Sequence, residues 1–483
     1  MEISREELRK LDKEEIIDIL LAIMAKVAEL TIIVNQQAER IAELEARLNQ
    51  NSGNSSKPPS KDGYNKPPTM RKPSGKERGG QRGHKGSGLK LPQPPSQFVN
   101  HNPSRCSNCN NAATCEANRL VTETRYEIDI EIKPTVTAHQ AMRVTCPRTG
   151  HILTGNFPME ITSTMQYGVN LEALAISLNV QGAVSVGRTH EILSGVFGVP
   201  ISTGTISNMV SDCADSVRPT IKEIKAALVA EPLVGFDETG TAIDGKTHWA
   251  HVASTETLTH IEVKPKRGRE AMDAIGILPN FRHIGVHDCL ASYFKYTAML
   301  HALCNAHTLR ELEGITQNYK QDWADKLAAL LRTMKQAKDE LMANGETAAP
   351  DEMIAKFNRA YDAILIEAAA INPIPPKDPS KKGRIKKGKA RSLIERLITH
   401  KAKYLRFFSD FTVPFDNNQA ERDIRMFKVK QKVSGCFRST DGANDFAAIL
   451  SFISTARKRG FSAFISIRDA LLGYPFSLAP VHL

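Results

Sequence analysis

The sequence lacks any long uninterrupted apolar run. Its longest apolar stretch, residues 16–34, is interrupted by Asp18, Lys26 and Glu29, whereas a membrane-spanning helix needs about 20 mostly apolar residues. Residues 1–7 are too acidic for a signal or transit peptide. We therefore expect no membrane segment, and we place the chain in a bacterial-type cytoplasm, associated with the nucleoid.

Cysteine is also scarce, with eight in 483 residues. A secreted protein held by disulfides is usually short and dense in cysteine, so the thiols are expected to be reduced. The hydrophobic content of 41% and the charged content of 24% are typical of globular proteins, which excludes a wholly disordered chain. At about 150 residues per domain, the length predicts several modules.

Acidic residues are too few to balance the basic ones. Lys and Arg number 64 against 53 Asp and Glu, which leaves a net charge of +11 and favours a polyanionic partner. Residues 51–100 alone hold ten basic and two acidic residues, a net +8. The composition of residues 51–97, rich in Gly, Pro and Ser, predicts a disordered basic linker. It can serve as a solvated tether, as an arm that follows phosphates, or as both.

Apolar residues recur on a strict seven-residue repeat near the N-terminus, and only Gln37 is polar in it. This pattern predicts a coiled-coil dimerisation helix, and we expect a homodimer or a higher homo-oligomer. The alternative, an amphipathic helix lying on its own domain, would drift towards a 3.6-residue period. The repeat consists of Ile16, Leu20, Ile23, Val27, Leu30, Val34, Gln37, Ile41, Leu44 and Leu48.

Cysteine and histidine spacing indicates a metal site in the next segment. Cys106 and Cys109 are two residues apart, and Cys146 and His151 follow a stretch, residues 126–132, that alternates like a strand. Two such thiolates with a distant thiolate and imidazole can hold one structural Zn²⁺. The alternative is a metal-free β module. Competing ligands are Cys115, His101 and His139.

Residues 186–209 have the outline of a helix-turn-helix. One short helix is expected over residues 186–197, a break at 198–200, and a second helix, capped by Ser202 and Thr203, that runs through Met209. Many helical hairpins share this outline. The side chains expected to contact DNA are Ser202, Thr203, Thr205 and Asn208.

Acidic residues stand at matching places after two predicted strands. Asp237 follows the strand 233–236 and Asp288 follows the strand 283–287. If the two strands pair side by side, both carboxylates reach one rim. Glu421 lies on a helix that begins near Asn417, where asparagines can supply caps. The other predicted strands are 241–243, 247–252 and 258–263, with a hairpin turn at Asp244 and Gly245.

Two strand-end aspartates and a helical glutamate can hold two Mg²⁺ about 4 Å apart for displacement at a phosphodiester. Without a cation the three carboxylates would repel one another. Basic residues follow the glutamate closely and could clamp phosphates. These residues are Arg422, Arg425, Lys428, Lys430, Lys432 and Arg438.

Cys304 and His307 lie three residues apart on a predicted helix and share a face. They can be interpreted as a nucleophile pair or as part of a metal site. No third group that would orient them is evident, so a structural role is favoured.

With these motifs, the chain resembles DDE-type transposases of the insertion sequence 66 family. The motifs that carry the resemblance are Asp237-Glu238-Thr239, Asp288 with Ala291-Ser292-Tyr293, Cys304-Asn305-Ala306-His307-x-x-Arg310, Asp416-Asn417-Asn418-x-Ala420-Glu421-Arg422-x-x-Arg425, and, in the linker, Pro58-Pro59-Ser60 and Gly80-Gln81-x-Gly83-His84-Lys85-Gly86. The sequence departs from the family in having Cys289 where glycine is expected. It also has Cys146 and His151 in place of a second Cys-x2-Cys.

The resemblance implies a DNA transposase that cleaves and transfers strands, with Asp237, Asp288 and Glu421 as its catalytic Mg²⁺ ligands. Its expected partners are the terminal inverted repeats of the element and target DNA, and accessory proteins of the same element are candidate partners. A non-enzymatic DNA-binding regulator would account for the first half of the chain but not for the three acids. A metal-dependent nuclease without strand transfer is the third interpretation.

The fold class expected is multidomain α+β, with a coiled coil, a small zinc-binding β module, a helix-turn-helix region and an RNase H-like core that carries a helical insertion. The segments are 1–50 coiled coil, 51–97 linker, 98–160 zinc module, 161–228 helical DNA-binding region, 229–304 first part of the core, 305–412 helical insertion, 413–440 core helix with Glu421, and 441–483 C-terminal helical segment.

Overall fold

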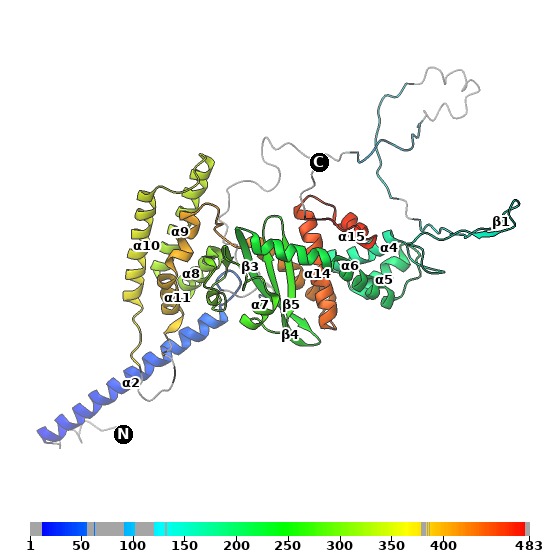
Figure 1. Ribbon diagram of the computed structural model, residues 1–483. Coiled ribbons are helices and arrows are strands. Elements are labelled where there is room, and N and C mark those ends of the chain that lie inside the picture. The colour runs from blue at the N-terminus through cyan, green and yellow to red at the C-terminus, as the bar shows by residue number, and fades with distance from the viewer. Residues whose placement is uncertain are drawn as a thin grey trace.

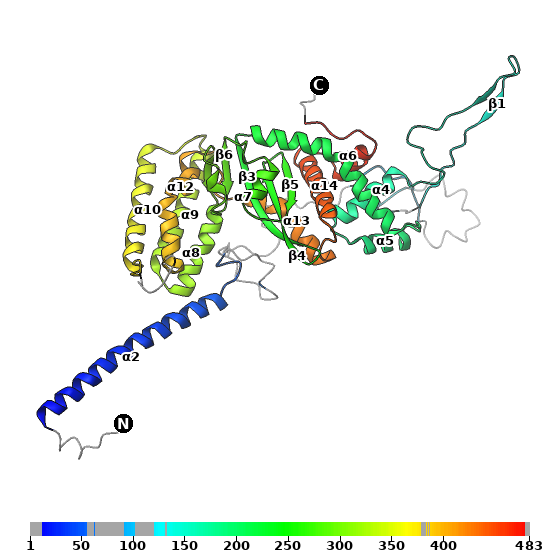
Figure 2. The same cartoon turned by 60° about the horizontal axis from the view of Figure 1, so that its bottom comes forward.

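The protein is a mixed α and β chain in which a five-stranded sheet lies between two groups of helices (Figures 1 and 2). The computed structural model describes residues 12–55, 62, 91–101, 120–130, 133–377, 383, 385 and 387–478. Within this part of the chain, no helix is both long and apolar enough to cross a lipid bilayer.

The central sheet has the strand order β5-β4-β3-β6-β7. Its first three strands in chain order are antiparallel neighbours, and the last two run parallel to β3. The predicted turn between β3 and β4 is confirmed, because Asp244 and Gly245 both have positive φ angles, 47° and 72°. The strands are β3 Leu233–Ile243, β4 Lys246–Ser254, β5 Thr259–Lys264, β6 Ile284–His287 and β7 Leu300–Leu303.

Two strand predictions are corrected by this sheet. Residues 233–236 and 241–243 form one strand, because β3 pairs with β4 without a break from Gly235 to Ile243. The short strand β7 was not predicted, since four residues beside a helix start give too little alternation to recognise.

Helices cover both faces of the sheet. On one face, α7 (Arg269–Ile275) and the C-terminal half of α6 (Thr203–Ala230) bury the β3 side chains Val234 and Phe236. On the other face lie α13 (Asn418–Ser434) and α14 (Thr440–Lys458). Edge strand β5 is covered by α14, whose Ser451 hydroxyl accepts the Ile261 N–H at 2.8 Å. Such cover protects an edge strand from pairing with other chains.

The predicted helical insertion is a bundle that packs beside β6 and β7 (Figure 2). Its core includes the fully buried Trp323, Tyr361 and Phe407. The bundle begins directly after β7 and ends before α13, the helix that carries Glu421. Its helices are α8 Asn305–Tyr319, α9 Asp322–Ala343, α10 Asp351–Ile371, α11 Gly388–Thr399 and α12 Lys401–Ser409.

The helices at the opposite end of the sheet include the segment for which a helix-turn-helix was predicted. The first helix is present as α5 (Val186–Gly195), but the second, α6, runs to Ala230 instead of ending near Met209. It continues because its apolar face stays buried through Val217, Ile224 and Leu228. Packed with them are α4 Val169–Ile176, the π-helical turn η3 Ser177–Gln181 and α15 Ala463–Leu471; the 3₁₀ turn η4, Tyr293–Lys295, follows β6.

The N-terminal helix α2 (Lys13–Leu48) projects from the molecule beside the insertion (Figure 1). Its apolar side chains are exposed, with Leu20 and Val27 each more than half accessible. After the helix, Asn54 is buried against α8, and its side-chain amide donates to the Gln317 Oε1 at 2.8 Å. Gly314 allows this approach, because a Cβ there would clash with the Asn54 carbonyl oxygen.

The predicted zinc module is described only in part. Cys106, Cys109 and Cys115 lie outside the described residues. The described part contains one hairpin, β1 (Arg143–Thr145) and β2 (Ile152–Thr154). The strand predicted over residues 126–132 is wrong for residues 126–130, which are in no strand, while residues 131 and 132 are outside the described part.

Candidate catalytic site

The pairing of β3 with β6 brings Asp237 and Asp288 to the same level of the sheet. Gly235 is paired with Val286, and each aspartate lies two residues beyond this pair. Asp288 follows the end of β6, as predicted, whereas Asp237 lies inside the longer strand β3. The two carboxylates therefore come from adjacent parallel strands at the edge where those strands diverge.

Helix α13 carries Glu421 to the face of β3 that bears Asp237. Asn417, which precedes the helix, donates its side-chain amide to the Phe236 carbonyl at 2.8 Å. It does not cap its own helix with its side chain, which corrects the expected role. Gly235 makes this contact possible, because a Cβ at that position would clash with Asn417 Oδ1. One turn beyond Asn417, Glu421 lies near enough to Asp237 for its charge to raise the pKa of that aspartate.

Burial is the largest cause that raises the pKa of each of the three acids. Burial raises the pKa of Asp237 well above its usual value, and the nearby carboxylates of Glu238, Glu421 and Asp288 add to the effect. Burial, then Glu238, raises the pKa of Asp288 to about 6. Burial raises the pKa of Glu421 as well. Carboxylates that gather at this cost fit a hard divalent cation, whose charge would offset the repulsion.

A fourth carboxylate, Glu238, is fully buried behind the site. Arg267 donates to its Oε1 from Nε at 2.8 Å and lies within 2.6 Å through Nη2, while the Tyr293 hydroxyl donates to Oε2 at 2.6 Å. The guanidinium of Arg267 also lies 3.6 Å from Asp288 Oδ2 and 4.9 Å from the centre of the Trp249 ring. The role of Arg267 was not predicted, because only the tertiary fold brings the segment after β5 to Glu238 and Asp288.

The start of α8 lies beside Glu421. Cys304 Sγ accepts the Asn417 N–H at 3.2 Å. His307 Nδ1 and Arg310 Nη2 lie 3.6 and 3.5 Å from Glu421 Oε1. Burial raises the pKa of the Cys304 thiol to about 12, which makes it a poor nucleophile. The geometry therefore does not favour a Cys-His nucleophile pair.

The basic residues after Glu421 divide into two groups. Lys428 donates to the Gly240 carbonyl and is partly buried. Lys430 is buried, and its amine lies 3.3 Å from the Asn179 carbonyl and over the Phe446 ring. Placing Lys430 on a DNA-facing surface is therefore wrong. The residues with exposed side chains are Arg422, Arg425, Lys432 and Arg438.

Ser202 caps α6 as predicted, since its Oγ accepts the Thr205 N–H at 3.0 Å. The Thr205 hydroxyl lies 2.9 Å from the same oxygen and is partly buried, so it serves the cap. Ser202, Thr203 and Asn208 are exposed on the first turns of the helix. These three side chains remain available for contact with a partner.

Cys146 and His151 flank the turn of the β1–β2 hairpin. The Cys146 N–H donates to the His151 carbonyl at 2.8 Å, and Gly150 has a φ of 70° in the turn. A hydrogen bond from the Thr149 side chain lowers the pKa of the Cys146 thiol. The hairpin thus brings two of the predicted zinc ligands to one end, but their proposed partners are outside the described residues.

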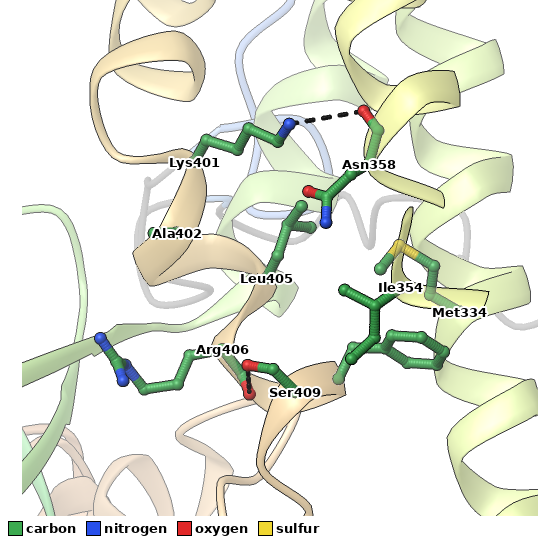
Figure 3. Close-up of a pocket in the computed structure, with 9 residues that line it drawn as sticks. Met334, Ile354, Asn358, Lys401, Ala402, Leu405, Arg406 and Ser409 are labelled. Atoms are coloured by element: carbon green, nitrogen blue, oxygen red, sulfur yellow. Dashed lines mark hydrogen bonds between the residues drawn. The ribbon is translucent and has the colours of Figure 1, made fainter. Parts of the chain in front are cut away.

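A pocket inside the helical insertion lies apart from the carboxylates (Figure 3). Lys401, Ser409 and the backbone carbonyl of Asn358 are already engaged there. Lys401 contacts the Asn358 carbonyl at 3.4 Å and both oxygens of Asp362 at 2.7 Å, and Ser409 donates to the Arg406 carbonyl at 3.2 Å. The pocket therefore adds no chemistry to the site.

Comparison with known families agrees with a DNA-processing protein. Residues 164–445, more than half of the chain, match the family model described as Transposase IS66 family, and the chain belongs to this family. The resemblance seen in the motifs is thereby confirmed. Membership implies DNA binding and a role in transposition, and transposases are typically metal-dependent. Residues 3–90 match a family of unknown function (DUF6444), and no curated protein matches the chain.

Proposed function

We propose that the protein is a metal-dependent DNA transposase that cleaves the ends of its element and joins them to target DNA. The observation that carries the proposal is the placement of Asp237 and Asp288 on two adjacent parallel strands, with Glu421 on the helix that packs against β3, near enough for its charge to raise the pKa of Asp237. The strand order, with three antiparallel strands followed by two parallel ones, supports the expected RNase H-like core.

The three carboxylates would hold two Mg²⁺, since all their ligand atoms are oxygens. Bound Mg²⁺ supplies positive charge next to the phosphodiester and to the attacking and departing oxygens. The chain's own residues prepare the site. Asn417 fixes the helix of Glu421 on the strand of Asp237, and Arg267 holds the buried Glu238 beside Asp288. No covalent enzyme intermediate is expected.

The other modules would recognise and pair the DNA ends. The exposed residues Ser202, Thr203 and Asn208 at the start of α6 would contact the terminal repeats, with Thr205 supporting the cap. The Cys106, Cys109, Cys146 and His151 module would hold one Zn²⁺. The exposed apolar face of α2 would pair two copies, so that two DNA ends are held together in the nucleoid.

The test is strand cleavage of labelled terminal repeats in Mg²⁺ and in EDTA. Glu421→Gln should abolish cleavage and leave binding to the repeats intact, whereas Glu340→Gln, on the exposed surface of α9, should cleave like the parent chain. Full cleavage by Glu421→Gln would refute the site. Binding without metal-dependent nicking would favour a regulator, and nicking without joined products would favour a nuclease.

A further inference from the structure

The start of α8 and the start of α13 bring together three side chains with different ligand atoms. Cys304 Sγ, a ring nitrogen of His307 and a carboxylate oxygen of Glu421 all lie within 4.8 Å of one another. Cys304 is only 2% exposed. His307 Nδ1 is buried and has no hydrogen-bond partner among the described residues, although it lies 3.6 Å from Glu421 Oε1. A buried nitrogen left in this state needs a partner.

We propose that Cys304, His307 and Glu421 form a binding site for a Zn²⁺-class divalent cation, next to the all-oxygen site of the two aspartates. Sulfur, nitrogen and oxygen together select cations of this class, whereas Mg²⁺ prefers oxygen alone. Glu421 belongs to both sites, with Oε1 turned towards His307. The second part of the proposal, that Zn²⁺ here competes with Mg²⁺ for Glu421, rests on the proposed function.

The geometry needs little adjustment to close around an ion. For three atoms mutually within 4.8 Å there is always a point no more than about 2.8 Å from each, and zinc bonds are about 2.0–2.3 Å long. Shifts of about 0.5–0.8 Å in each side chain would suffice. Three protein ligands leave the fourth tetrahedral position open for water or for a phosphate oxygen of DNA.

The backbone already supports Cys304 as a ligand. Its own N–H donates to the His287 carbonyl at 3.0 Å, which fixes the residue at the end of β7. Its sulfur accepts the Asn417 N–H at 3.2 Å. Outer hydrogen bonds of this kind orient metal ligands. They also link Cys304 to the loop that positions Glu421.

Arg310 is the group that opposes cation binding. Its guanidinium lies 3.5 Å from Glu421 Oε1, where it partly neutralises the carboxylate when no metal is bound. A cation must displace it from that oxygen. Replacing Arg310 with glutamine should therefore strengthen metal binding, whereas loss of any of the three ligands should weaken it.

The experiment is a Co²⁺ titration of the full-length chain that carries Cys106→Ser and Cys109→Ser, so that the proposed zinc module contributes no cysteine pair. We expect one equivalent of Co²⁺, a sulfur-to-cobalt charge-transfer band, and displacement by Zn²⁺. Cys304→Ser should abolish the band. His307→Gln and Glu421→Gln should weaken binding by about a hundredfold, since even outer partners of a metal site are worth 10- to 100-fold.

Matched controls separate ligand loss from general damage. Cys436→Ser and His248→Gln change an exposed thiol and a partly exposed imidazole elsewhere, and both should bind Co²⁺ like the parent chain. Circular dichroism checks that each variant is folded. If Cys304→Ser does not fold, Arg310→Gln decides, because it should bind at least several-fold more tightly. Unchanged binding in folded Cys304→Ser, or in Arg310→Gln, would overturn the site.

Zn²⁺ inhibition of Mg²⁺-dependent strand cleavage is measured separately. We expect inhibition in the parent chain and its relief in His307→Gln. Cobalt binding that depends on Cys304 and His307, in a chain without cleavage activity, would refute the proposed function alone. Cleavage with no such cobalt binding would refute the metal site alone.

Discussion

The guanidinium of Arg267 lies 3.6 Å from Asp288 and 2.6 Å from the buried Glu238, so one arginine serves two carboxylates of the site. Its side chain is held over the ring of Trp249. Because Glu238 has no exposed side-chain surface, its charge depends on this partner and on the Tyr293 hydroxyl. Arg267 therefore stabilises the part of the fold that presents Asp288.

Arg267→Gln should destabilise the protein by about 2–3 kcal/mol, because removal of one partner leaves Glu238 as a buried unpaired charge. Chemical denaturation measures the change. Arg269→Gln is the matched control, since Arg269 is exposed and its partner Asp273 is exposed too, so the loss there should be under about 0.5 kcal/mol. Equal losses in the two variants would refute the role assigned to Arg267.

Gly235→Ala should separate α13 from β3 and reduce strand cleavage strongly. A Cβ at this position would clash with Asn417 Oδ1, and Asn417 can retreat only by breaking its bond to the Phe236 carbonyl. Gly240→Ala, in the same strand, should have much less effect, because the nearest atoms to its Cβ are 3.9 Å away. Thermal unfolding and cleavage assays test the pair, and similar behaviour of the two variants would contradict the argument.

Asn417→Ala should cost about 1–3 kcal/mol of stability, since it leaves the buried Phe236 carbonyl without its donor. Asn418→Ala is the control, because the Asn418 side chain makes no hydrogen bond among the described residues. Cleavage should fall with Asn417→Ala by more than the loss of folded protein explains, since Glu421 loses its anchor to the strand of Asp237. Chemical denaturation and cleavage assays on the same samples measure the loss of stability and the loss of activity.

The pKa values of the aspartates predict how Mg²⁺ stabilises the fold. The pKa of Asp288 is about 6 in the folded chain and about 4 in the unfolded chain, so the metal-free fold takes up a proton between these values. Its free energy of unfolding should therefore fall as the pH rises through this window, by on the order of 2 kcal/mol. The raised pKa of Asp237 adds in the same direction.

Mg²⁺ binds the deprotonated carboxylates, so it should raise the melting temperature more at pH 8 than at pH 5. Differential scanning fluorimetry with and without Mg²⁺ measures both shifts. Asp288→Asn removes one titrating ligand and should reduce the difference between the two pH values. A Mg²⁺ shift that does not change with pH would argue against cation binding by these carboxylates.

Substitution of Arg425 should change the salt dependence of DNA binding, and substitution of Lys430 should not. Arg425→Gln should reduce the salt dependence of binding by about one unit of slope, as expected for one lost phosphate contact. Lys430→Met should leave that slope unchanged and instead lower stability, because Lys430 is buried against the Asn179 carbonyl. Binding measured over a range of salt concentrations distinguishes the two. A changed slope in Lys430→Met would contradict this argument and support a DNA contact by Lys430.

The sequence was most informative where a local signal coincides with tertiary structure. The turn at Asp244 and Gly245 requires positive φ angles, and the Ser202 cap follows from one side chain and one N–H, so both were predictable. The placement of Asp237 and Asp288 also followed from their position after apolar strands, although β3 proved longer than alternation indicated.

What the sequence did not reveal depends on contacts between distant segments. Lys430 is a lysine in a basic stretch, and only packing against η3 explains its burial. Arg267 belongs to none of the motifs, and the motif that contains Asn417 does not indicate that its side chain binds the Phe236 carbonyl. Helix α6 continued past Met209 because α14 contacts its middle turns and the sheet and α7 bury its last ones.

The docking of Asn54 at Gly314 gives α2 a fixed end and a free end. The 36-residue helix is about 54 Å long, at 1.5 Å per residue, and its C-terminal end is the one held against the insertion. Parallel pairing of two such helices would bring both catalytic sites to the same end of the rod. Antiparallel pairing would place them at opposite ends. The relative direction of the two α2 helices therefore sets the distance between the two DNA ends.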